Sequence, residues 1–168
     1  MTFELKPLSA EAVPRALEKA ERYRLLNEPG EAESICLDVL AVDRENQAAI
    51  VTLVLALTDQ FDTGASFAFG EAQGLIERIH DAYARTYYTG ILHERRAKAQ
   101  LRQNALGSSA RVYRSLHEAM TWFEKAQALR PAENDDALLR WNACARILMR
   151  DHHLVPAMEE REDPLLLE

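Results

Sequence analysis

A pattern of small and bulky residues at helical spacing occurs twice in the chain, and it constrains the fold more than any other feature. In each copy a small residue is followed four positions later by a bulky one, three positions after that by a smaller one, and then by a turn. The two sets are Ala32, Cys36 and Val39, and Ala119, Phe123 and Ala126. Residues at this spacing share one face of an α-helix, so each copy predicts a helix that must bury its stripe against a neighbour.

Similar stripes, divided by turn residues, predict helices along most of the chain. We expect helices at 15–26, from Glu31 to a break at 42–46, around 50–57, around 69–79, and at 82–106, 110–130 and 135–150. Asn27-Glu28-Pro29-Gly30 ends the first of them, and residues 58–66 are expected to form a loop. The apolar stripe of the helix expected at 82–106 is less regular than the others, and Gly90 interrupts that stripe. No segment has the alternation of a strand, so the sequence predicts an all-α fold.

Composition and charge restrict the class of protein. A length of 168 residues, 48% of them apolar, suits one domain with or without a tail. The formal net charge of −7 disfavours nucleic acid as a partner. Cys36 and Cys144 lie among apolar residues and are expected to be buried. No signal peptide is visible and no apolar run is long enough to span a membrane, so a cytoplasmic location with no membrane partner is expected.

The recurring hairpin pattern resembles the tetratricopeptide repeat, whose period is about 34 residues. The stripes at Ala32 and Ala119 resemble the second helix of that unit. Ala20 matches the small position of its first helix, and Val54 follows one period later. Ala72 matches the second helix of the next unit if about six residues are inserted near 58–64, and a further 13 to 17 extra residues are expected between 97 and 112.

The resemblance implies a short right-handed α-solenoid of three helical hairpins and a C-terminal capping helix, in which Cys144 takes the small position. The repeat domain is expected over residues 1–150, with units at about 13–46, 47–86 and 87–133 and the cap at 135–150. The segment 151–168 has six acids, one Arg and two Pro, and is expected to be an irregular or docked acidic tail.

In proteins of this family, exposed residues of the first helices form a concave face that holds a peptide. The matching positions here are Leu17, Glu21, Arg24, Val51, Leu55 and Thr58. Val51 and Leu55 make the third helix apolar on nearly all sides, so something must cover it. A neighbouring helix or the tail could supply that cover, as could a bound partner or a second copy of the chain.

A basic segment overlaps the third hairpin. Between His93 and Arg114 the only acid is Glu94, and the six basic residues are Arg95, Arg96, Lys98, Arg102, Arg111 and Arg114. One interpretation is a solvated helix face paired with the acidic tail. The others are a docking patch for an acidic peptide or a second subunit, and a site that binds nucleic acid at low salt.

Motifs for catalysis, nucleotides and metals are lacking in the sequence. The adjacent His152 and His153 do not face one ligand on a helix, and Glu77 and His80 form only one of the two Glu-x-x-His motifs of a di-iron bundle. We therefore expect no enzyme activity and no cofactor. The sequence predicts a protein–protein interaction scaffold that binds a peptide or protein on its concave face. The alternatives are a self-associating homo-oligomeric subunit, an adaptor for nucleic acid or an acidic partner using residues 95–114, and an enzyme or metal protein.

Overall fold

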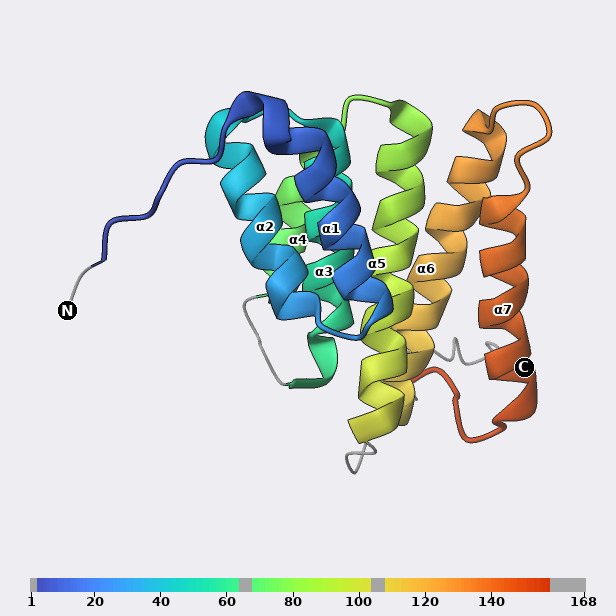
Figure 1. Ribbon diagram of the computed structural model, residues 1–168. Helices are drawn as coiled ribbons and strands as arrows, with labels where there is room; N and C mark the ends of the chain where they lie inside the picture. The colour runs from blue at the N-terminus through green and yellow to red at the C-terminus, as the bar shows by residue number, and fades with distance from the viewer. Residues whose placement is uncertain (1–2, 64–67, 104–107, 158–168) are drawn as a thin grey trace, which may run out of the picture.

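A computed structural model describes residues 3–63, 68–103 and 108–157, and within these ranges the chain is all-helical with no strand. The all-α prediction is therefore confirmed for the described residues (Figure 1). The α-helices are α1 (Val13–Leu25), α2 (Pro29–Val42), α3 (Gln47–Asp59), α4 (Ala68–Glu77), α5 (Ala82–Gln103), α6 (Ser109–Leu129) and α7 (Asp136–Arg150). Two short 3-10 turns, η1 (Ala10–Ala12) and η2 (Phe61–Thr63), precede α1 and follow α3.

Each helix packs against the next one along the chain, and α3 also contacts both α1 and α5. Helices α1, α3 and α5 therefore form a row, and α2, α4 and α6 are the return helices that connect or extend it (Figure 1). Helix α7 adds a fourth member next to α5, since Arg140 of α7 lies 3.5 Å from Glu94 of α5. This row of four helices is the frame for the candidate site.

The helix boundaries follow local signals in the sequence. Asn27 ends α1 with a positive φ of 61°, a conformation that Asn tolerates better than most residues. Asn46 caps α3, because its side chain accepts a hydrogen bond of 2.9 Å from the amide of Ala49. Asp81 does the same for α5 by accepting from the amide of Ala84 at 2.7 Å.

The buried core confirms the predicted stripes. It forms two clusters, a first core cluster around α1 to α4 and a second core cluster around α5 to α7, and α5 contributes Leu92 to the first and Ile91 to the second. All of the following residues have 0% exposure: Ala20, Ala32, Cys36, Val39, Val54, Ala72, Ala119, Phe123, Ala126 and Cys144. The positions expected to be small are therefore fully buried in the closely packed core.

Helix α5 runs through Gly90, from Ala82 to Gln103, although Gly90 interrupts its apolar stripe. A β-carbon at Gly90 would lie 2.5 Å from Cε1 of the Phe123 ring, far inside normal contact distance. The interruption of the apolar stripe at Gly90 therefore has a packing reason, because Gly90 is itself buried in α5. Gly90 is the small residue of α5, and the bulky residue of the α6 stripe packs directly over it.

Several predicted boundaries need correction. Helix α3 continues to Asp59 and η2 follows, so the expected loop over 58–66 begins later, and its residues 64–66 lie outside the described ranges. Ile79 is buried but lies beyond the end of α4. The expected division between units at 86/87 falls inside α5, which starts at Ala82 after its Asp81 cap.

The two helices that correspond to the predicted third hairpin, α5 and α6, are longer than the other described helices of the chain. Helices α5 and α6 have 22 and 21 residues, compared with 13 in α1. The expected end of the fifth helix at residue 106, like residues 104–107 of the insertion, lies outside the described ranges.

After α7, Leu154 is 7% exposed and packs into the second core cluster, so the start of the tail docks on the domain. Residues 158–168 are not described. None of the described helices has the length and apolar character required to cross a membrane.

Candidate functional site

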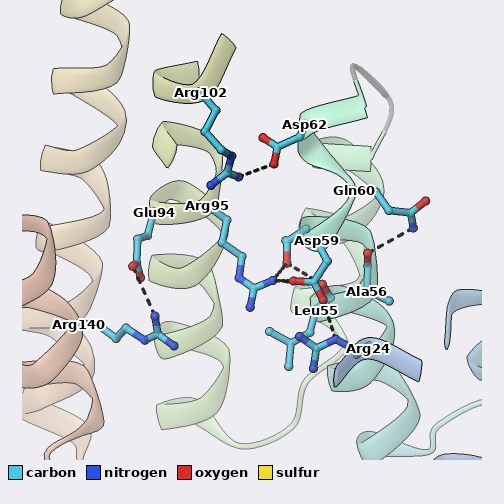
Figure 2. A network of polar contacts seen from close by, with 11 residues as sticks. Arg24, Leu55, Ala56, Asp59, Gln60, Asp62, Glu94, Arg95, Arg102 and Arg140 are labelled. Atoms are coloured by element: carbon cyan, nitrogen blue, oxygen red, sulfur yellow. Dashed lines mark hydrogen bonds and ion pairs between the residues drawn. The ribbon is translucent and has the colours of Figure 1, made fainter. Parts of the chain in front are cut away.

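A groove of about 530 Å³ lies on the row formed by α1, α3, α5 and α7. Its lining is dominated by charged side chains from all four helices and from η2 (Figure 2). The cationic residues are Arg24, Arg95, Lys98, Arg102 and Arg140, and the acidic residues are Asp59, Asp62 and Glu94. Leu25, Asn27 and Thr58 complete the lining. These eleven residues define the groove.

The first group of charges, the Asp59 cluster, consists of Arg24, Asp59 and Arg95. Asp59 stands at the end of α3 and accepts from Nε of Arg24 at 2.8 Å and from Nη1 of Arg95. Nη1 of Arg95 also donates to the Thr58 hydroxyl at 3.0 Å. Burial lowers the pKa of Arg95, and the carboxylate of Asp59 opposes that effect. One carboxylate thus serves two guanidinium groups whose side chains are only 19% and 24% exposed.

The second group, the Glu94 cluster, consists of Glu94, Lys98 and Arg140. Glu94 has 0% exposure, although it is an acidic residue, and it lies one turn before Lys98, whose side chain is 34% exposed. Its Oε1 atom accepts from Nζ of Lys98 and lies 3.5 Å from Nη1 of Arg140. Its Oε2 atom is buried without a hydrogen-bond partner among the described residues. Burial lowers the pKa of Arg140, but the Glu94 carboxylate and the Tyr87 hydroxyl outweigh burial and raise it.

The groove carries more positive than negative charge. Among the residues of the groove, Asp59 and Glu94 are each shared by two cations, whereas Asp62 pairs with Arg102 at 2.7 Å. Five cationic and three acidic side chains line the groove, so two positive charges are in excess there, in a chain with a net charge of −7. A half-buried groove screens charge less than open solvent does, so this local excess attracts anions.

The structure brings together only part of the predicted site. Arg24, Arg95, Lys98 and Arg102 line the groove, as does Thr58. Leu17 and Glu21 lie on α1 but are not among the lining residues. Val51 packs against the first core cluster and Leu55 against the second, although the Leu55 carbonyl accepts from Nη1 of Arg95 at 3.4 Å.

Arg96 is separated from the rest of the basic segment. Its guanidinium lies 4.6 Å from the ring centre of Phe69, on the side of α5 that faces α4. The basic residues that line the groove are paired with Asp59, Asp62 and Glu94, whereas the sequence suggested the acidic tail as their partner. The basic residues of α5 are therefore divided between two faces of that helix, and Arg111 and Arg114 lie on α6.

The apolar surface expected on the third helix is covered by other helices of the same chain. Helix α3 contacts α1, α2, α4 and α5, and Ala48 is its only exposed residue. This explains why the helix is apolar on nearly all sides, and it removes the exposed face on which self-association was to depend.

Sequence reasoning missed the acidic residues of the groove and Arg140. Glu94 follows the buried Ile91 by three positions and precedes the buried Ala97 by three, so it occupies a core position of the α5 stripe. A charged residue at such a position was a detectable signal of a buried ion pair. Asp59 and Asp62 gave no comparable signal, because their segment was expected to be a loop.

The candidate metal motifs of the sequence do not come together in a metal site within the described residues. No group of three or more His, Cys, Asp or Glu side chains within the described ranges could hold a metal ion. Glu77 and His80 are both exposed, as are His152 and His153. Burial raises the pKa of Cys36 and that of Cys144 to about 12, so both thiols stay protonated at neutral pH and are poor nucleophiles.

No protein-family model, curated protein or solved structure matches the chain. The comparisons therefore neither assign the chain to the tetratricopeptide repeat family nor exclude it. The groove and the helices that build it are the basis for a function.

Proposed function

We propose that the chain is a non-enzymatic protein-interaction module that binds a peptide or protein partner in the groove. The observation that supports this best is the lining itself. Charged side chains from α1, α3, α5 and α7 meet in one open depression that has two positive charges in excess. A surface assembled from four helices is long enough to contact several residues of a partner, and it holds no metal-binding cluster within the described ranges.

In this proposal the helices are tetratricopeptide-like hairpins, α1/α2, α3/α4 and α5/α6, with α7 as the cap, and the protein acts in the cytoplasm. The row of α1, α3, α5 and α7 presents the binding face, while α2, α4 and α6 hold the row in place. Contact with apolar side chains such as Leu25, which is 88% exposed, supplies affinity. The surrounding charges select the partner and speed its association.

Affinity capture with matched variants tests this function. The full chain is immobilised as wild type, as an Arg24→Gln/Arg140→Gln variant of the groove, and as Arg96→Gln, which removes a cation outside the groove. We expect a specific protein to be retained by the wild type and by Arg96→Gln but lost by the groove variant. Far-UV circular dichroism and the thermal midpoint establish that all three proteins are folded.

The captured partner is then purified and its binding measured directly with the same three proteins. Equal affinity for the wild type and the groove variant would contradict the proposal. Capture of nucleic acid in place of protein, with affinity that collapses between low and physiological salt, would support the adaptor alternative. A concentration-dependent sedimentation coefficient with no other partner would support self-association.

A further inference from the structure

We propose that the groove recognises a partner segment with two acidic side chains spaced two residues apart in extended conformation, of the type Glu-x-Glu. The inference rests on the proposed function and specifies the chemistry of the partner. It depends on the way in which the groove shares its carboxylates among its cations.

Each of the two neighbouring clusters in the groove has two cationic side chains and only one carboxylate. In the Asp59 cluster one carboxylate is shared by Arg24 and Arg95, and in the Glu94 cluster one is shared by Lys98 and Arg140. A partly desolvated cation that lacks its own anion is poorly compensated. One ligand carboxylate at each cluster would give every cation a partner, so the groove fits two anionic groups rather than one.

The ion pair of Arg140 with Glu94 is longer than that of Arg24 with Asp59. Arg24 donates to Asp59 at 2.8 Å, whereas Arg140 reaches Glu94 only at 3.5 Å, at the limit of a hydrogen bond. The Arg140 side chain is also 42% exposed. A ligand carboxylate at Arg140 therefore competes with a long Glu94 contact and with the hydrogen bond to the Tyr87 hydroxyl, and not with a short ion pair.

The spacing follows from the helix that connects the clusters. Arg95 and Lys98 are three residues apart on α5, and β-carbons at that separation lie about 5–6 Å from each other. In an extended peptide, side chains at i and i+2 point to the same side and are about 6.6 Å apart, whereas those at i and i+1 point to opposite sides. Two carboxylates with one residue between them therefore match the two clusters.

The lining favours a protein segment over a polyphosphate or nucleic acid. The highly exposed Leu25 in the groove wall offers apolar contact to the residues that flank the acids. The net charge of −7 repels a long polyanion, while a short segment with two charges meets mainly the local positive excess.

Fluorescence anisotropy with labelled peptides tests the inference on the full chain. The probe is a nine-residue peptide with Glu-Leu-Glu at its centre in an alanine–leucine background, and the control peptide has Gln-Leu-Gln. We expect the acidic peptide to bind about tenfold more tightly, since charge-assisted hydrogen bonds exceed neutral ones, and its affinity to fall as ionic strength rises.

Variants assign the binding to the two clusters. Arg140→Gln and Arg95→Gln should each weaken the acidic peptide about tenfold, and Arg96→Gln should leave its affinity unchanged. Asp59→Asn should strengthen binding several-fold, because it removes the internal anion that competes for Arg24 and Arg95. Arg140 is half exposed, so its variant remains informative if Arg95→Gln fails to fold.

Three results would overturn the inference: equal affinity for the two peptides, an equal loss in Arg96→Gln and Arg140→Gln, or full displacement of the peptide by millimolar inorganic phosphate. The last would identify a site for a single anion. If the acidic motif fails while a captured protein still requires Arg24 and Arg140, the proposed function stands and only the ligand chemistry is wrong. If capture also fails to depend on the groove, the proposed function fails too.

Discussion

The contact between Gly90 and Phe123 should make Gly90→Ala destabilising, although Ala is the better helix former. In an exposed helix the exchange stabilises by about 1 kcal/mol. At Gly90 the new methyl carbon would lie 2.5 Å from Cε1 and 2.7 Å from Cδ1 of Phe123, a ring with 0% exposure. Overpacking of this kind costs about 1–3 kcal/mol, and the severity of the overlap places it near the upper end. We therefore expect a net loss of about 2 kcal/mol.

Urea denaturation followed by far-UV circular dichroism measures this effect. Gly74→Ala is the matched control, because Gly74 is exposed in α4 and a β-carbon there would meet nothing within 4 Å. That variant should gain up to about 1 kcal/mol. In a Phe123→Leu background the cost of Gly90→Ala should shrink or change sign, since the ring atoms that it strikes are gone. If Gly90→Ala is as stable as Gly74→Ala, or if its cost is unchanged in the Phe123→Leu background, the packing described for α5 and α6 is incorrect.

Three further predictions concern other elements of the fold. Asn46→Ala should lower the free energy of unfolding by about 1 kcal/mol, measured by urea denaturation, because the amide of Ala49 loses its cap. Glu94→Gln should lower the free energy of unfolding by about 2 kcal/mol in the same assay, because Lys98 and Arg140 both lose their buried anion. Lys98→Gln should cost less, because it removes only one partly exposed partner of Glu94. Cys36 and Cys144 should resist a thiol reagent at about pH 8 until the protein is unfolded. Burial raises the pKa of both thiols from 9.0 to about 12, so the stabilisation from keeping them protonated is complete below pH 9 and declines as the pH rises towards 12. The urea midpoint of a double Cys→Ala variant should therefore fall less with rising pH than that of the wild type.

The parts of the fold that could be predicted depend on local patterns. The stripe Ala32, Cys36 and Val39 identified a buried helix face because apolar residues at spacings of three and four line up on one side of a helix and must be covered. Helix ends could also be predicted, since Pro29 and Asn46 act on the backbone within one turn of their own position. Such signals require no knowledge of which helices become neighbours.

What could not be predicted depends on residues that are distant in the sequence. Gly90 was predicted only as a gap in the apolar stripe of its helix, because a stripe is a local pattern, and its packing role depends on Phe123, which is 33 positions away. Arg95 belonged to a basic segment whose partner was sought in the acidic tail, whereas its partner is Asp59, 36 positions earlier. The candidate site therefore emerges only when α1, α3, α5 and α7 are placed side by side.

Hydrogen–deuterium exchange of the full chain with and without its captured partner tests the central claim most directly. If the groove is the binding surface, the partner should slow exchange in the segments of α1, α3, α5 and α7 that carry Arg24, Asp59, Arg95 and Arg140, and leave the outer turns of α2, α4 and α6 unchanged. Protection confined to α2, α4 and α6, with none along the four helices of the groove, would contradict the assignment of the binding face.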